Sequence, residues 1–97
     1  MLKPFLFVVN LPQGVTRAQI LEYLNTRPEV KHWYAFFPTA IVVISDRSAT
    51  ELAGAIRQGF PTLHFIVSEI PFGSNNGWLH KDVWDFINNP ESSGRWP

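Results

Sequence analysis

The sequence predicts an α+β domain in which a four-stranded antiparallel sheet packs against helices. Two observations support this prediction. Four short runs rich in β-branched and aromatic residues alternate with two amphipathic segments, in the order strand–helix–strand–strand–helix–strand. Both amphipathic segments begin with a capping box, in which a Ser or Thr is followed three residues later by a Glu or Gln.

The first strand is predicted over residues 5–9, a run of Phe, Leu and Val that is closed by a turn containing Pro and Gly. Both of its alternating faces are apolar, which is typical of a central strand that is covered on both sides. The first helix is predicted over residues 17–26, with Thr16 as its N-cap. It should end before Pro28, because the residue that precedes a proline disfavours helical backbone.

The second and third strands are predicted over residues 31–37 and 40–45, and the short segment between them, Pro38 and Thr39, is expected to form a hairpin turn. The third strand reads AIVVIS and is apolar on both faces, like the first. We therefore expect the first and third strands to lie in the middle of the sheet, with the second strand at an edge.

The second helix is predicted to begin after Ser48, whose capping box is completed by Glu51. A carboxylate at this position also suits the positive end of the helix dipole. Gly59 is placed to terminate the helix. The fourth strand is then predicted over residues 63–70, and a last helix over residues 79–88, where apolar residues recur at helical spacing.

Right-handed connections turn this order of elements into the ferredoxin-like βαββαβ sandwich, with the first two helices on one face of the sheet. The other face would be left open, although both central strands are apolar there as well. We expect the C-terminal helix or a second copy of the chain to cover it. Only 16% of the residues are charged, which favours a protein that hides part of its surface in a homodimer.

The chain has 97 residues, so we expect one domain over residues 1–90, which includes the C-terminal helix, and a flexible tail over residues 91–97 in which Trp96 could dock. Eight basic residues balance eight acidic ones, which argues against a strongly basic nucleic-acid-binding protein. There is no cysteine, so disulfides and thiolate chemistry are excluded. No apolar run suits a membrane span or a signal peptide, and we expect a cytoplasmic protein without membrane contact.

Motifs for catalysis or ligand binding are weak. The glycines form no phosphate-binding loop, and the dispersed His32, His64 and His80 lack the spacing of a zinc site. Asp46 is best explained as a turn residue, and in this fold it would lie at the opposite end of the sheet from Asn10, so the two side chains are not expected to share one metal ion. We therefore predict no catalytic, cofactor-binding or metal-binding residue.

The aromatic run at His32, Trp33 and Tyr34 invites comparison with RNA-binding sheets of this topology, which stack bases on aromatic residues of their two central strands. Here the strand richest in aromatic residues is expected at an edge. The basic pattern that accompanies RNA binding is also missing from the run over residues 40–46. Packing in the core or at an interface is therefore the favoured role of these aromatic side chains.

Two segments resemble a known family. The run at residues 32–34, followed by a short turn and the strand at 40–45, is similar to a Trp/His/Tyr cluster of the small SinR-like proteins. The segment at residues 75–88 is similar to their Gly-Trp-Leu-x-Lys-x-x-Trp-Asp-x-Leu/Ile segment, and the residues that match it are Gly77, Trp78, Leu79, Lys81, Trp84, Asp85 and Ile87. The resemblance extends over about residues 5–88. It implies structural or interface roles for Trp33, Tyr34, Trp78, Leu79, Trp84 and Asp85.

The SinR-like group is similar in turn to the CRISPR-associated ferredoxin-like proteins of the second Cas type and to the VapD-type ribonucleases. These relatives form homodimers, and some are metal-dependent nucleases that use an aspartate at the end of the first strand. Asn10 occupies that position here, and its uncharged amide binds magnesium less well than a carboxylate does. The resemblance therefore implies the fold and a homodimer more strongly than it implies an activity.

Two functions follow. The favoured one is a non-catalytic homodimeric interaction domain without a cofactor. The alternative is a nucleic-acid-binding protein or a nuclease dependent on Mg²⁺ or Mn²⁺, with the scattered basic residues Lys31, Arg47 and Arg57 as candidate contacts to nucleic acid. A toxin–antitoxin or prophage accessory role rests on analogy alone.

Overall fold

Four strands form one antiparallel sheet in the order β2–β3–β1–β4, in a computed structural model that describes residues 1–92. β1 (Lys3–Asn10) and β3 (Ala40–Ser45) lie in the middle, and β2 (His32–Tyr34) and β4 (His64–Glu69) form the edges. The α+β class, the four-stranded antiparallel sheet and the two central strands are therefore confirmed.

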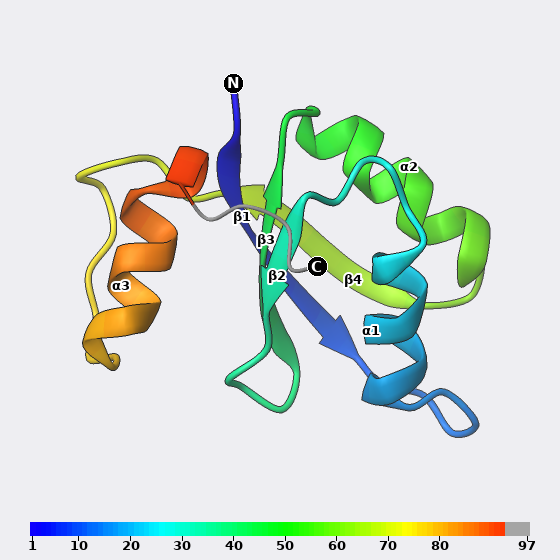
Figure 1. The fold of residues 1–97 in the computed structure, drawn as a ribbon. Coiled ribbons are helices and arrows are strands. Elements are labelled where there is room, and N and C mark those ends of the chain that lie inside the picture. The colour runs from blue at the N-terminus through cyan, green and yellow to red at the C-terminus, as the bar shows by residue number, and fades with distance from the viewer. Residues whose placement is uncertain (93–97) are drawn as a thin grey trace.

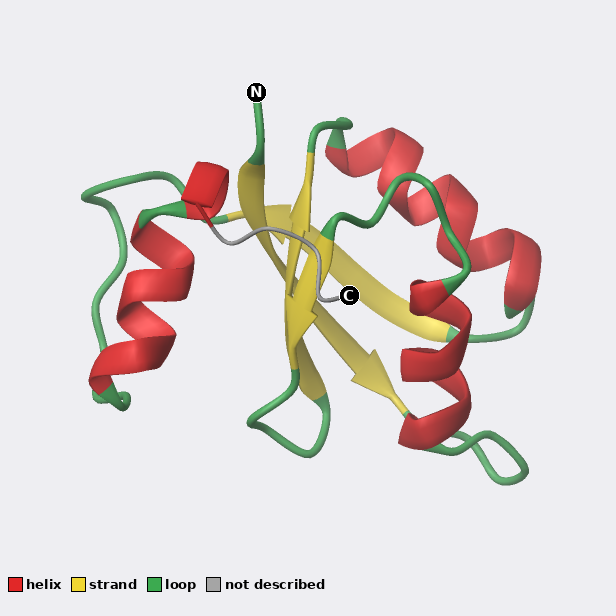
Figure 2. Ribbon diagram, viewed as in Figure 1, coloured by secondary structure: helices red, strands yellow, loops and turns green. Residues whose placement is uncertain are grey.

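Helices lie on both sides of this sheet. α1 (Arg17–Asn25) and α2 (Ala49–Gly59) pack on one side, and α3 (Lys81–Asn88) lies on the other, as Figure 1 shows. Figure 2 shows the sheet as the layer between these two groups of helices. The short 3-10 helix η1 (Pro90–Ser92) follows α3 and returns the chain to the start of β1, where the backbone N–H of Leu2 donates to Oε1 of Glu91 at 2.7 Å.

Both predicted capping boxes are present. At α1, the hydroxyl of Thr16 accepts a hydrogen bond from the backbone N–H of Gln19 at 3.2 Å, and the side chain of Gln19 accepts one from the backbone of Thr16 at 2.8 Å. At α2, Ser48 and Glu51 make the same pair of bonds at 3.1 and 3.2 Å. Local sequence therefore determines where both helices begin.

β2 is shorter than the predicted strand over residues 31–37. It pairs with β3 at three positions, and the chain leaves the sheet after Tyr34. The backbone carbonyl of Ala35 accepts a hydrogen bond from the guanidinium of Arg17 on α1. A side chain from the first helix therefore binds the backbone where the chain leaves the sheet, and no local pattern in residues 31–37 could show this contact.

The last helix begins at Lys81 rather than at residue 79. His80 is its N-cap, and Nδ1 of this side chain accepts a hydrogen bond from the backbone N–H of Asp82 at 3.2 Å. Leu79 therefore precedes the helix and packs against the core beneath it as part of the connecting loop. Such a cap was not expected, because His is not among the residues favoured at N-caps.

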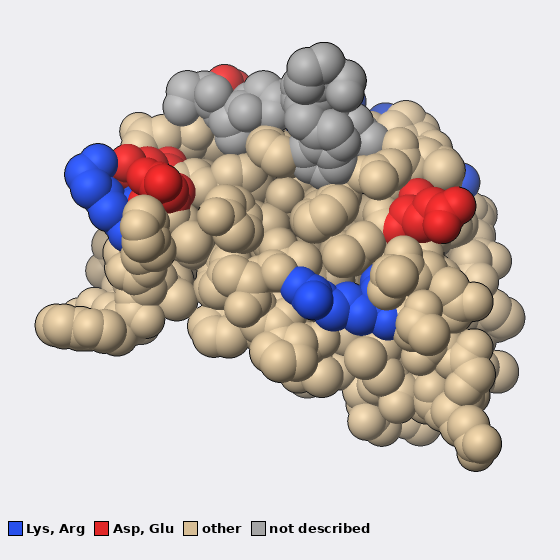
Figure 3. Space-filling model, turned by 60° about the horizontal axis from the view of Figure 1, so that its bottom comes forward, with Lys and Arg blue, Asp and Glu red and all other residues tan. Residues whose placement is uncertain are grey.

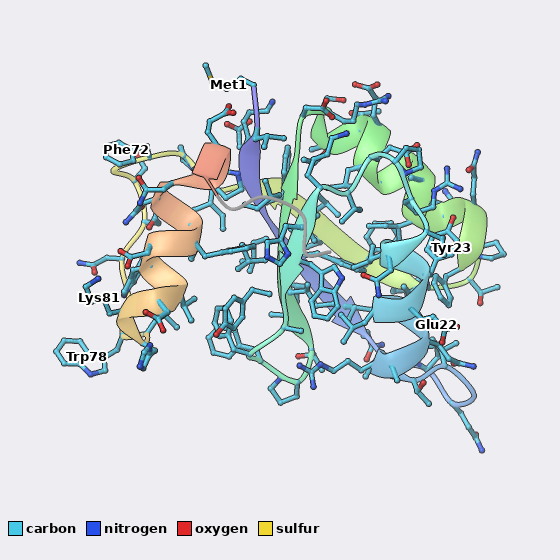
Figure 4. The ribbon with its side chains drawn as sticks, viewed as in Figure 1. Met1, Glu22, Tyr23, Phe72, Trp78 and Lys81 are labelled. Atoms are coloured by element: carbon cyan, nitrogen blue, oxygen red, sulfur yellow. The ribbon has the colours of Figure 1, made fainter. Side chains whose placement is uncertain are left out.

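The main hydrophobic core fills the space between the sheet and the pair α1 and α2. Its members are buried apolar side chains from the strands, both helices and the adjoining loops: Phe5, Phe7, Val9, Ile20, Leu24, Val30, Ile41, Val43, Leu52, Ile56 and Leu63. The two helices also meet directly through Tyr23, labelled in Figure 4, whose hydroxyl donates to the carbonyl of Ala55 at 2.7 Å. The sheet, α1 and α2 thus enclose one core.

None of the helices in residues 1–92 is long and apolar enough to cross a membrane. The predicted flexible tail over residues 91–97 is described only at its first two residues, and Trp96 lies outside the described residues.

Candidate interaction surface

The face of the sheet that is turned away from α1 and α2, called the rear face below, is apolar over its central strands. Because side chains alternate along each strand, the pairing registers place the following residues on this face: Pro4, Leu6, Val8, Asn10, His32, Tyr34, Ala40, Val42, Ile44, His64, Ile66 and Ser68. None of these residues carries a formal charge at neutral pH when histidine is neutral. Removing this surface from water therefore does not require burying a formal charge.

α3 covers the half of the rear face that is formed by β2 and β3. Val83 and Ile87 of α3 pack against Val42 of β3 in a second, smaller hydrophobic core. The ring of Phe86 meets the edge-strand residues His32 and Tyr34 in edge-to-face contacts, with ring centroids 4.9 and 5.5 Å apart. The C-terminal helix is therefore one of the two expected covers of this face, and it covers the face only in part.

The other half of the rear face, formed by β1 and β4, stays open in the described part of the chain. Val8 and Ile66 are register partners on these two strands, and they are 41% and 68% exposed. Leu6 lies beside them on β1 and is half-buried. These three residues, Leu6, Val8 and Ile66, are called the open patch below.

Single exposed apolar residues are common on protein surfaces, and adjoining ones on neighbouring strands form a larger apolar surface. Ser68 and His64 flank Ile66 along β4, so the patch has polar neighbours at its outer edge. In the view of Figure 3 the charged side chains occupy a few small areas of an otherwise uncharged surface.

The predicted interface residues are divided among several places in the structure. Trp33 lies on the face of the sheet that packs against α1 and α2, where its indole N–H donates to Oδ1 of Asn25 at 2.8 Å. Tyr34 lies on the rear face and is 38% exposed. Both residues belong to β2, but they point to opposite sides of the sheet, so they do not form one contact surface.

The family-like segment around α3 is also divided. Leu79 and the half-buried Trp84 pack against the second hydrophobic core. Trp78 is fully exposed and projects from the tip of the loop before α3, as Figure 4 shows. Asp85 accepts a hydrogen bond from Nζ of Lys81 at 2.9 Å, which is an ordinary pair across one helical turn.

Of the three candidate nucleic-acid contacts, Lys31 and Arg47 lie at the same end of β3, and Arg57 lies away from both. Arg47 precedes α2 and pairs with Asp46 and Glu51 at 3.3 and 3.7 Å. Arg57 lies in the last turn of the same helix, more than two helical turns away. Lys31 precedes β2 and is half-buried. These side chains do not form a continuous basic stripe.

Asn10 and Asp46 lie at opposite ends of the sheet. Lys3, at the start of β1, pairs with Ser45, so Asp46 adjoins the beginning of β1 and Asn10 its end. Within residues 1–92, no group of three or more His, Cys, Asp or Glu side chains is placed to hold a metal ion. The geometry therefore offers no support for a metal shared between these two positions.

The sequence alone predicts one apolar rear face and does not distinguish the open patch from the part that α3 covers. One signal was present in the sequence. His64, Ile66 and Ser68 alternate polar, apolar and polar along one face of β4, which is typical of a strand whose face is open to solvent.

The fold and this surface define the class of protein: a small α+β domain whose antiparallel sheet is covered by two helices on one face and, over about half its width, by a third helix on the other. Comparison with models of protein families finds no match, and comparisons with curated proteins and with solved structures find no similar chain.

Proposed function

We propose that this protein is a non-catalytic interaction domain that works as a homodimer, with a ferredoxin-like βαββαβ sandwich extended by α3. The strand order β2–β3–β1–β4, with α1 and α2 on the same side of the sheet, supports the ferredoxin-like topology. The single observation that carries the homodimer is the open patch, where Val8 and Ile66 lie side by side and exposed.

Burial of apolar surface contributes about 25 cal/mol per Å², so covering a few hundred Å² of the rear face is worth several kcal/mol before the cost of association. For a small domain with a modest core, this is a large fraction of its total stability. The open patch is therefore a place where a partner would stabilise the fold.

A second copy is the partner best suited to this surface. The chain has zero formal net charge, so two copies do not repel each other at long range. The open patch and its neighbours on the strands are uncharged, so bringing two patches together leaves no like charges in contact. Apolar contact between identical surfaces is the usual basis of a two-fold symmetric dimer.

Light scattering coupled to size-exclusion chromatography tests this proposal directly. We expect the wild-type chain to be a dimer at micromolar concentration, and Ile66→Lys to be a monomer with an unchanged far-UV circular dichroism spectrum. Gln58→Lys introduces the same charge on the exposed side of α2 and should remain dimeric. A wild-type chain that is monomeric at micromolar concentration would overturn the proposal.

Binding or cleavage of nucleic acid is the alternative function, and it has less support. Among the candidate contacts, Arg57 lies away from Lys31 and Arg47, and Arg47 is already paired with acidic neighbours. Incubation of the pure protein with RNA and DNA in the presence of Mg²⁺ or Mn²⁺ decides between the two functions. Cleavage, or binding that weakens with added salt, would favour the alternative.

A further inference from the structure

We infer that the second copy joins along the outer edge of β4, in an antiparallel pairing centred on Ile66, so that the two sheets become one continuous sheet. This inference rests on the homodimer proposed above and specifies its geometry. Three features of β4 support it. Some of its backbone N–H and C=O groups point away from β1, the strand has few features that hinder pairing at an edge, and one pairing register brings apolar side chains together.

The backbone of β4 has hydrogen-bonding groups directed outward. The backbone N–H of Ile70 donates to the carbonyl of Pro4 at 2.9 Å, which fixes the register of the bonds between β4 and β1. Bonds to a given neighbour recur at every second residue of an antiparallel strand. Ile66 and Ser68 therefore direct their N–H and C=O groups to β1, while Phe65 and Val67 direct theirs away from it.

β4 lacks most of the features that usually protect an edge strand from pairing, and its one charged residue, Glu69, is the last residue of the strand. Such edges are commonly short, bulged, or interrupted by Lys or Pro. β4 has six residues and contains neither Lys nor Pro, and each of its residues has a partner on β1, so the strand has no bulge. β2, at the other edge, has only three residues. β4 is therefore the edge that is suited to extension of the sheet.

Space for a second strand is present on the α2 side of this edge. A groove of about 600 Å³ lies between α2 and β4, and Phe65, Val67 and Arg57 are among the residues that line it. The side chains of Phe65 and Val67 are half-buried in the monomer, so part of their apolar surface is still exposed. A strand added along β4 would cover part of this surface as well.

The side chains favour one register. Pairing about Ile66 places it opposite Ile66 of the second copy and places Phe65 opposite Val67 of that copy, so apolar residues meet on both faces of the sheet. Pairing about Val67 would instead place Phe65 opposite Glu69. In the Ile66-centred register Glu69 lies opposite Leu63 of the second copy, and no two carboxylates face each other.

The same register uses the outward backbone groups. Phe65 and Val67 of one copy each exchange hydrogen bonds with Val67 and Phe65 of the other. The two Ile66 residues then form a non-hydrogen-bonded pair, the kind in which side chains approach most closely. On the rear face the two Ile66 side chains then cover each other, while Leu6 and Val8 of each copy lie on the same face, one strand away from the contact.

Disulfide trapping tests this geometry, because the wild-type chain has no cysteine. In a non-hydrogen-bonded pair the Cα atoms are about 4.5 Å apart, which is within the range that a disulfide bridges. Ile66→Cys should therefore form a covalent dimer on mild oxidation, and a thiol reductant should reverse it. Ser68→Cys is the control: its two copies would be about 13 Å apart along the strands, at about 3.3 Å per residue, and should stay unlinked.

The outcomes separate this inference from the homodimer itself. If the wild type and the reduced Ile66→Cys variant are dimers by light scattering but oxidation does not link Ile66→Cys, or links Ser68→Cys equally well, the homodimer stands and the β4 pairing is wrong. If the wild type is a monomer, both fail. Hydrogen exchange of the wild type gives a second measurement: the amides of Phe65 and Val67 should exchange more slowly at high than at low protein concentration, and concentration-independent exchange would also contradict the pairing.

Discussion

Val8 of β1 and Ile66 of β4 are register partners in the sheet, and both side chains remain exposed on its rear face. On the next strand of the same face, Val42 is 2% exposed because α3 packs over it. The change from a buried to an open surface thus occurs across one strand spacing. α3 therefore covers β3 on the rear face but does not reach Val8 and Ile66, which leaves part of this apolar face exposed.

The contact between α3 and the rear face should depend on Phe86. Phe86→Ala removes two edge-to-face ring contacts, with His32 and Tyr34, each worth about 0.5–1.5 kcal/mol. We expect the free energy of unfolding to fall by about 1–3 kcal/mol, measured by urea denaturation. Trp78→Ala removes a larger but fully exposed ring and should change stability by less than about 0.5 kcal/mol. Equal losses in the two variants would show that α3 is not held by this contact.

The close approach of α1 to α2 should depend on the absence of a side chain at Gly59. A Cβ atom added there would lie 2.5 Å from the ring of Tyr23, so we expect Gly59→Ala to lower the free energy of unfolding by about 1–3 kcal/mol. Gly54 lies in the same helix with open space around it, and Gly54→Ala should raise stability by about 0.5–1 kcal/mol through helix propensity. Thermal unfolding of both variants measures the difference, and a stabilising Gly59→Ala would contradict this packing.

The hydroxyl of Ser45 should matter more than that of an exposed serine. Ser45 is fully buried at the end of β3, where it donates to the carbonyl of Glu29 at 2.6 Å and accepts from the backbone N–H of Arg47 at 3.0 Å. Ser45→Ala leaves both groups without this partner and should cost about 1–3 kcal/mol. Ser74→Ala, in the exposed loop before α3, is the control and should be nearly neutral. Chemical denaturation compares the two variants.

Stability at acid pH should depend in part on Glu51. Its hydrogen bond with the backbone of Ser48, together with that from the Ser48 side chain, lowers the pKa of this carboxyl from its ordinary value of 4.5. A group whose pKa is lowered by folding contributes stability above the pKa it has in the unfolded chain, and this contribution is lost as pH falls through the folded value. The stability of the wild type should therefore fall as the pH is lowered below about 4.5.

Glu51→Gln keeps a capping side chain but cannot titrate, so the loss of stability between neutral and acid pH should be smaller than in the wild type. Glu29, whose pKa is also lowered, chiefly by its hydrogen bond with Arg27, will preserve part of the pH dependence in both proteins. The midpoints of thermal unfolding across this pH range check the prediction. Parallel pH profiles for the variant and the wild type would show that the cap makes no titratable contribution.

Local patterns were sufficient for most of the fold. The capping boxes at Thr16 and Ser48 predict the starts of both helices, because the hydrogen bonds that begin a helix are made between residues three apart in the chain. The runs that became β1 and β3 are apolar on both faces, which predicts their central position. The end of β2 could not be predicted in this way, because the bond from Arg17 to Ala35 joins residues that are distant in sequence.

The sequence by itself determined the order of the elements, their caps and the two-sided apolar character of the central strands, since each of these depends on neighbouring residues. Only the tertiary structure decided that α3 covers Val42 and leaves Val8 and Ile66 open, because exposure depends on where a helix some forty residues from β3 and more than seventy from β1 comes to rest. Apolar periodicity shows that a face must be covered. The three-dimensional packing alone shows which part of it is still uncovered.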